Sequence, residues 1–189
     1  MAPAEATGGG DREVYLQVYR GRAWPPIIHT GVRLAGDIHE WTFGSASRLL
    51  VNGSPLHGVI PEIARCHDYG DWQFWKAVPL GRYRGTAWPR PDDPNQRAVI
   101  RALASGEECF ADGSYRVLSR NCWDFSAHLA AALVGGAPRA HLDLIHGLND
   151  RSLGVPVGTT GFVRRRLGWG GAIAACVLFA VVLVLGWRG

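Results

Sequence analysis

The stretch SRNCWDFS, residues 119–126, places a cysteine between an asparagine and a tryptophan just where the pattern of the chain changes. Apolar residues then recur at helical spacing until two glycines end the pattern, which predicts an amphipathic helix over 122–134. These positions are Phe125, Leu129, Leu133, Gly135 and Gly136. Asn121 fits the N-cap, with Asp124 able to complete a capping box. Cys122 therefore falls in the first turn, where the helix dipole lowers the pKa of an exposed thiol, whereas burial raises it.

Alternating apolar and polar residues upstream of this helix predict β-strands. The segment EVYLQVYRG (13–21) has a period of two, and IIHTGVRLAGDIHEWTFG (27–44) contains two β-like segments around a short glycine-containing turn. We expect a three-stranded antiparallel piece from these segments. Residues 45–94 are rich in Gly, Pro and Trp and are expected to form loops and short strands. A second helix is expected over 95–105, and one more strand over 113–121.

The chain is predicted to divide into four parts. Residues 1–12 are small and glycine-rich and are expected to be disordered, 13–146 form one α+β domain, and 147–166 form a linker with a basic flank. Residues 167–187 carry no charge over 21 positions, have tryptophans near both ends and follow three arginines. At a rise of about 1.5 Å per residue they match a bilayer core, so we expect one C-terminal transmembrane helix.

The ends of the chain indicate how this span would be placed. The N-terminus lacks the apolar segment of a secretory signal, and only Arg188 and Gly189 follow the span. We therefore expect a single-pass tail anchor with the domain in the cytosol, and the single basic residue after the span favours the endoplasmic reticulum. Thiols stay reduced in the cytosol, so Cys66, Cys109 and Cys122 are expected to be free.

The charge balance argues against nucleic acid as a partner. Four of the 20 basic residues lie beyond residue 163, where no acidic residue occurs, so the other 16 balance the 16 acidic residues. A nucleic-acid-binding domain normally carries a basic field. No CxxC or HExxH spacing occurs, and adjacent Cys66 and His67 are awkward ligands for one metal ion. The sequence therefore predicts no nucleic acid, no metal and no cofactor.

A cysteine nucleophile needs a base that accepts and returns its proton, and an imidazole is the usual one. Among the seven histidines, His29 is the best placed, because it begins a predicted strand. The others are scattered, and a lone histidine on a loop or helix surface is usually solvated. A cysteine at a helix start after a strand, with a histidine at a strand start, forms the two halves of a papain-like site in reversed chain order.

These stretches resemble the PPPDE or DeSI-type thiol isopeptidases over about residues 13–146. The most specific parts are the HTGV block with the following EWTFG, and NCWDFS, which is similar to the N-C-x-x-F-[ST] motif of that family. The resemblance implies a permuted papain-like fold in which His29 is the general base and Cys122 the nucleophile. It makes Asn121, Phe125 and Ser126 the motif neighbours. It also implies removal of SUMO or ubiquitin from lysine side chains through a thioester.

Several features of such a site stay open. The chain departs from the family pattern at Arg20-Gly21 and at Trp123-Asp124, which puts modifier preference in doubt. The backbone N–H of Cys122 is one expected oxyanion donor, and the side chain of Gln17 is a possible second. Glu40 and Thr42 on the neighbouring β segment are candidates for orienting His29, but a one-residue slip in strand register would turn both to the other face, so this assignment stays open.

Two other functions fit the same residues. LRAT and NlpC/P60-like lipid acyltransferases share the order of histidine before cysteine and often end in a membrane span, and His39 would supply the second histidine of their pattern. Against this, their cysteine motif carries a histidine where Asp124 stands. A membrane-tethered domain that binds ubiquitin-like modifiers without catalysis is the third reading, and it predicts that loss of the Cys122 thiol changes nothing in the cell.

Overall fold

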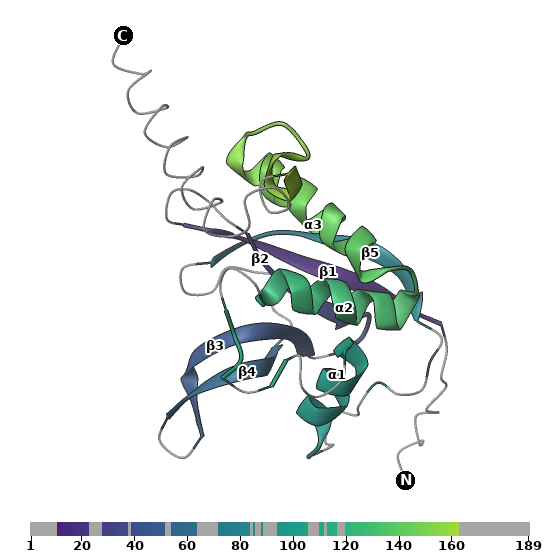
Figure 1. The fold of residues 1–189 in the computed structure, drawn as a ribbon. Coiled ribbons are helices and arrows are strands. Elements are labelled where there is room, and N and C mark those ends of the chain that lie inside the picture. The colour runs from purple at the N-terminus through teal and green to yellow at the C-terminus, as the bar shows by residue number, and fades with distance from the viewer. Residues whose placement is uncertain are drawn as a thin grey trace.

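The computed structural model describes residues 11–22, 28–37, 39–51, 54–63, 72–83, 85, 88, 94–105, 110–111, 113–116 and 120–162, with only the backbone for 45–51 and 54–63. The elements in chain order are β1 (Arg12–Gly21), β2 (Ile28–Leu34), β3 (His39–Val51), β4 (Ser54–Ile63), β5 (Trp72–Tyr83), α1 (Gln96–Ser105), α2 (Cys122–Val134) and α3 (Pro138–Leu153) (Figure 1). They form an α+β domain, as expected.

The strands form one antiparallel sheet in the order β4-β3-β2-β1-β5. The expected antiparallel piece, β1 to β3, is confirmed. The expectation of loops and short strands over 45–94 was wrong for β4, β5 and the second half of β3. The prolines that suggested loops, among them Pro61 and Pro79, lie on β4 and β5. These are the two edge strands, where a residue without an N–H is tolerated.

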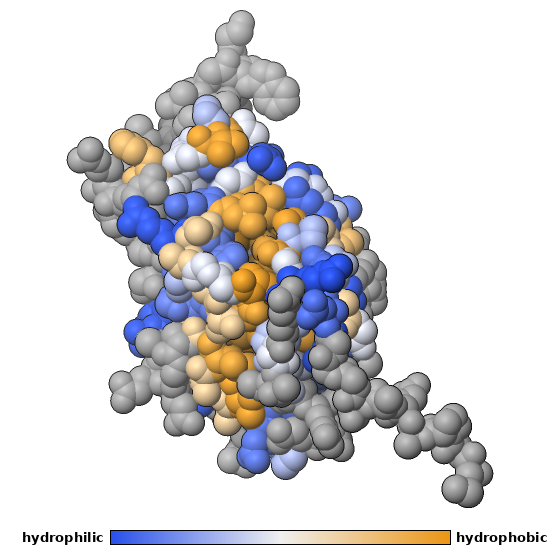
Figure 2. Space-filling view, turned by 90° about the vertical axis from the view of Figure 1, so that its right-hand side faces the viewer, coloured by the Kyte–Doolittle hydropathy of each residue, from blue (hydrophilic) through white to orange (hydrophobic). Residues whose placement is uncertain are grey.

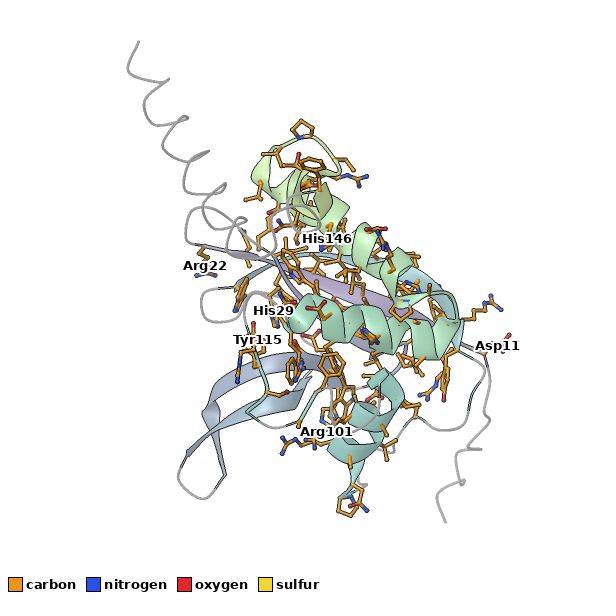
Figure 3. All side chains as sticks on the ribbon, in the orientation of Figure 1. Asp11, Arg22, His29, Arg101, Tyr115 and His146 are labelled. Carbon is orange, nitrogen blue, oxygen red and sulfur yellow. The ribbon has the colours of Figure 1, made fainter. Side chains whose placement is uncertain are left out.

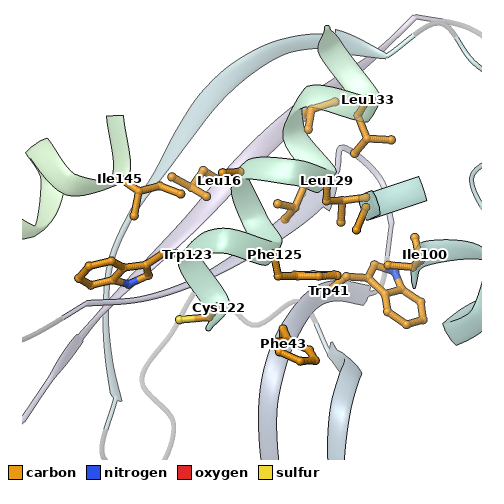
Figure 4. Close-up of a cluster of buried hydrophobic side chains, with 14 of the residues drawn as sticks. Leu16, Trp41, Phe43, Ile100, Cys122, Trp123, Phe125, Leu129, Leu133 and Ile145 are labelled. Atoms are coloured by element: carbon orange, nitrogen blue, oxygen red, sulfur yellow. The ribbon is translucent and has the colours of Figure 1, made fainter. Parts of the chain in front are cut away.

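Every second residue of the central strands faces the helices. The buried apolar positions on this face are Val14, Leu16, Val18, Val32 and Leu34. Helix α2 packs over them with Phe125 and Leu129 fully buried (Figure 4). Each large apolar side chain buried in this way contributes about 2 kcal/mol. The core therefore fixes where the first turn of α2 lies.

The expected helices are present as α1 and α2, but α3 was not foreseen. It begins with Pro138 in its first turn and ends at Gly154, which adopts the left-handed conformation (φ 72°). It runs through 147–153, a segment expected to belong to the linker. Gly147 lies inside α3, and a Cβ added there would meet the Val157 side chain at 3.6 Å, an ordinary contact distance. Of the strand expected over 113–121, the described residues show only a bridge between Arg116 and Arg120.

Apolar side chains form a band down the face of the molecule on which α2 ends, with hydrophilic residues on both sides (Figure 2). In the described part of the chain, no helix is both long and apolar enough to cross a membrane. The segment 1–12 was expected to be disordered, but Arg12 begins β1, and residues 1–10 lie outside the described part of the chain. The basic flank at 164–166 and the expected span at 167–187 also lie outside it.

Candidate functional site

Cys122 is the first residue of α2, as the sequence predicts. Its N-cap, Asn121, accepts hydrogen bonds from the backbone N–H of Trp123 (2.9 Å) and of Asp124 (3.3 Å). The carboxylate of Asp124 accepts in turn from the backbone N–H of Asn121 (3.2 Å). This reciprocal capping box occupies the donors of the second and third helical residues.

Burial controls the chemistry of the Cys122 thiol. The side chain is only 5% exposed, and burial raises its pKa to about 11. Hydrogen bonds from the backbone and hydroxyl of Thr30 and from the N–H of Cys122 act in the opposite direction but do not compensate. The lowering expected from the helix dipole is therefore outweighed by desolvation. At neutral pH the resting group is a thiol.

Thr30 connects strand β2 to the first turn of α2. Its hydroxyl is placed to donate to the carbonyl oxygen of Cys122 (3.2 Å) and to Oγ of Ser126 (3.0 Å). All three residues are buried. The motif neighbour Phe125 faces the core beside Phe43, with 6.0 Å between ring centroids. The NCWDFS block therefore serves to fix this turn against β2.

His29, next to Thr30 on β2, is held by Thr42. The Thr42 hydroxyl donates to the carbonyl oxygen of Thr30 (2.9 Å) and lies 3.0 Å from Nε2 of His29. A hydroxyl has a single proton, so it accepts the hydrogen bond from Nε2–H and leaves Nδ1 of the imidazole unprotonated. Burial lowers the pKa of His29 to about 4, which keeps the ring neutral. Of the two candidates for orienting His29, Thr42 is the residue in contact, whereas Glu40 binds the hydroxyl of Tyr19 (2.7 Å).

The candidate base His29 and the candidate nucleophile Cys122 are connected through Thr30, and no direct hydrogen bond between them is found among the described residues. Side chains alternate along a strand, so the Thr30 hydroxyl turned toward α2 leaves the ring of His29 on the other side. There it contacts Trp72, with 5.0 Å between ring centroids. Within the described residues, the ring's hydrogen bond goes to Thr42 and none joins it to Cys122. Such bonds are often long before substrate binds and tighten in the complex.

The site lies where the sheet divides. Strands β2 and β3 pair only at Val32–Trp41 and Arg33–Glu40. Beyond this point β3 continues with β4 and turns away from β1 and β2 (Figure 1). In this part of β2 the carbonyl oxygen of Ile28 accepts a hydrogen bond from Nε1 of Trp123 in the first turn of α2.

Gln17 lies on the middle of β1, opposite Gly31 of β2. Its neighbours Leu16 and Val18 face α2, so alternation places the Gln17 side chain on the same side of the sheet as His29. It is fully buried. Its role as an oxyanion donor stays a prediction.

Trp123, one of the departures from the family pattern, has a structural role. Its Nε1 donates to the carbonyl oxygen of Ile28 (2.8 Å), the residue before His29. The N–H of Ile28 donates to Oδ1 of Asn149 on α3 (3.2 Å). Two helices therefore hold the main chain where the histidine begins. No sequence pattern indicates these long-range contacts.

Tyr115 is a second residue that the sequence did not single out (Figure 3). Its ring packs against Phe43 with 5.4 Å between centroids. Burial raises the pKa of its hydroxyl, and the charges of Cys122 and Asp124 raise it further, so the phenol stays protonated. Among the described residues, no three His, Cys, Asp or Glu side chains group together as metal ligands would.

Comparisons of this chain with known protein families, with curated proteins and with solved structures find no match.

Proposed function

We propose that this chain is a cysteine hydrolase of the permuted papain-like type, with Cys122 as nucleophile and His29 as general base. The observation that supports it most strongly is the connection through Thr30. Thr30 contacts the nucleophile's turn with its hydroxyl and the residue that orients His29 with its carbonyl oxygen. A thiol at a capped helix start, with an oriented neutral imidazole on the adjoining strand, has the parts that acyl transfer through a thioester needs.

The two pKa shifts define the chemistry. Both groups are neutral at rest, so Nδ1 of His29 accepts the thiol proton as the sulfur attacks the substrate carbonyl. The N–H of Cys122 then turns to the developing oxyanion. The imidazolium protonates the departing amine, a thioester forms, and water activated by His29 hydrolyses it. Because the thiol is not ionised in advance, substrate binding must bring His29 and Cys122 into contact.

The substrate class follows from the resemblance of the NCWDFS and HTGV blocks to the PPPDE or DeSI-type isopeptidases. The bond cleaved would join the C-terminal glycine of SUMO or ubiquitin to a lysine side chain. The apolar segment 167–187 would tether the domain to the cytosolic face of the endoplasmic reticulum.

The proposal is tested with SUMO and ubiquitin probes that carry a thiol-reactive C-terminus, added to the full chain in neutral detergent. The wild type should form an adduct with one modifier, and Cys122→Ser and His29→Gln should form none. His39→Gln is the matched control, because His39 packs against Trp41 (6.1 Å between centroids) and does not contact His29. It should label like the wild type.

Two results would redirect the proposal. No adduct from a folded chain, with Cys122 still open to a small alkylating agent, would favour the lipid acyltransferase. Loss of labelling in His39→Gln would do the same, since only that family's pattern requires a second histidine. In the present structure Thr42 takes the place next to His29 that such a histidine would need.

A further inference from the structure

Two cationic side chains contact one tryptophan where β1 and β5 pair, and a third cation from α3 acts on one of them. The guanidinium of Arg20 lies 3.7 Å from the ring centroid of Trp75, and the ammonium of Lys76 lies 4.2 Å from the same ring. The third cation is Arg151 in the last turn of α3, close enough to influence Lys76. We call Arg20, Lys76 and Arg151 the cationic cluster.

No acidic group in the described part of the chain compensates the cationic cluster. The ion pair found among the described residues joins Arg82 to Asp11, which lie at the end of β1 away from Arg20. Nε of Arg20 is buried without a hydrogen-bond partner among the described residues. Burial lowers the pKa of Lys76, and the charges of Arg151 and Arg20 lower it further. Like charges held together around a buried donor cost free energy unless an anion joins them.

We propose that the cationic cluster is a binding site for a phosphate group. Two guanidinium groups and one ammonium supply more positive charge and more donors than one carboxylate can use, whereas a phosphate has several oxygens and up to two charges. Trp75 keeps Arg20 and Lys76 in place by cation–π contact. The site assigns a role to Arg20, the other departure from the family pattern. It does not depend on the thiol chemistry.

The phosphate belongs either to a lipid headgroup or to a soluble compound. Just after Arg151 the chain exposes two large apolar side chains, Val157 (65% exposed) and Phe162 (57% exposed). Apolar residues beside cations are typical of surfaces that contact anionic lipid. These residues favour the lipid as the source.

Binding is measured as the rise in melting temperature of the full chain in phosphatidylcholine nanodiscs when inorganic phosphate replaces chloride at equal ionic strength. At about ten times its dissociation constant, phosphate should raise the melting temperature of the wild type by about 4 °C. Lys76→Gln and Arg151→Gln should each bind phosphate about tenfold more weakly. Without phosphate both variants should still unfold cooperatively, and the melting temperature of each variant without phosphate is the baseline for its own response.

Arg139→Gln is the matched control, since Arg139 lies on α3 at the end opposite Arg151 and is exposed. It should respond to phosphate like the wild type. Nanodiscs containing phosphatidic acid separate the sources: a stabilised chain that gains nothing more from phosphate has lipid in the site. An equal gain in both kinds of disc indicates a soluble compound. Equal phosphate responses in wild type, Lys76→Gln and Arg151→Gln, or no response at all, would overturn the site.

Discussion

Two buried polar networks lie next to the start of β2, and they differ in how much unused hydrogen-bonding capacity their members have. At the end of α3, the carboxylate of Asp150 accepts from the backbone N–H of Gly158 (2.7 Å) and of Thr160 (2.8 Å), and from the Thr160 hydroxyl. At the start of α2, the thiol of Cys122 meets only weak donors from Thr30 and from its own backbone.

The difference separates structure from chemistry. Asp150 has strong donors for its charge, so its network is complete and stabilises the turn after α3. In the Cys122 network, the hydrogen bond of the His29 ring uses Nε2, so among the described residues Nδ1 keeps hydrogen-bonding capacity that a substrate can use. A buried polar group whose bonds are filled by main-chain donors is structural, whereas one with spare capacity next to a nucleophile can be functional.

The largest expected effect on stability comes from removing the carboxylate at the centre of the Asp150 network. Asp150→Ala leaves two backbone N–H groups without their acceptor and should lower the free energy of unfolding by about 3 kcal/mol. Cys122→Ala should change it by less than about 1 kcal/mol, because the thiol makes only weak bonds. Urea unfolding of both variants checks the contrast, and equal losses would contradict the distinction between the networks.

A second effect appears in the pH dependence of stability. The pKa of His29 is lowered from 6.5 to about 4, so the stability linked to it is present above pH 6.5 and lost as pH falls through about 4. The pKa of Cys122 is raised from 9.0 to about 11, so its contribution is present below pH 9 and lost as pH rises through about 11. On the acid side and on the alkaline side, the loss in the free energy of unfolding should be on the order of 2 kcal/mol. His29→Gln should flatten only the acid limb of the melting-temperature profile and Cys122→Ala only the alkaline limb; unchanged profiles would show that neither group is buried in solution.

A smaller effect tests the orientation of His29. Thr42→Val keeps the size of the side chain and removes the acceptor for Nε2–H, so the rate of probe labelling at Cys122 should fall about tenfold. Thr42→Ser keeps the hydroxyl and should retain most of the rate. Melting temperatures show whether both variants fold. A valine variant as fast as the serine variant would mean that Thr42 does not orient the base.

Sequence patterns were sufficient for the local elements and for Cys122, because period, cap and turn residues all lie close together in the chain. The capping box of Asn121 and Asp124 is an example. They were insufficient for Thr42, because strand register decides which residue of β3 lies next to His29, and a slip of one residue turns Glu40 and Thr42 together to the other face. The state of the thiol also escaped prediction, since burial depends on packing that the helix pattern does not contain. α3 was missed because the glycines of 147–163 suggested a linker, whereas Gly147 lies inside the helix and Gly154 ends it.

The main chain of Ile28 is held from α2 by Trp123 and from α3 by Asn149, with one hydrogen bond on each side. Strand β2 is thus anchored at its first residue, and the place of the histidine does not depend on the chain that leads to it. The connection after β1 could therefore be lengthened or replaced without moving His29. A protein engineer could insert a tag or recognition loop there on the same principle.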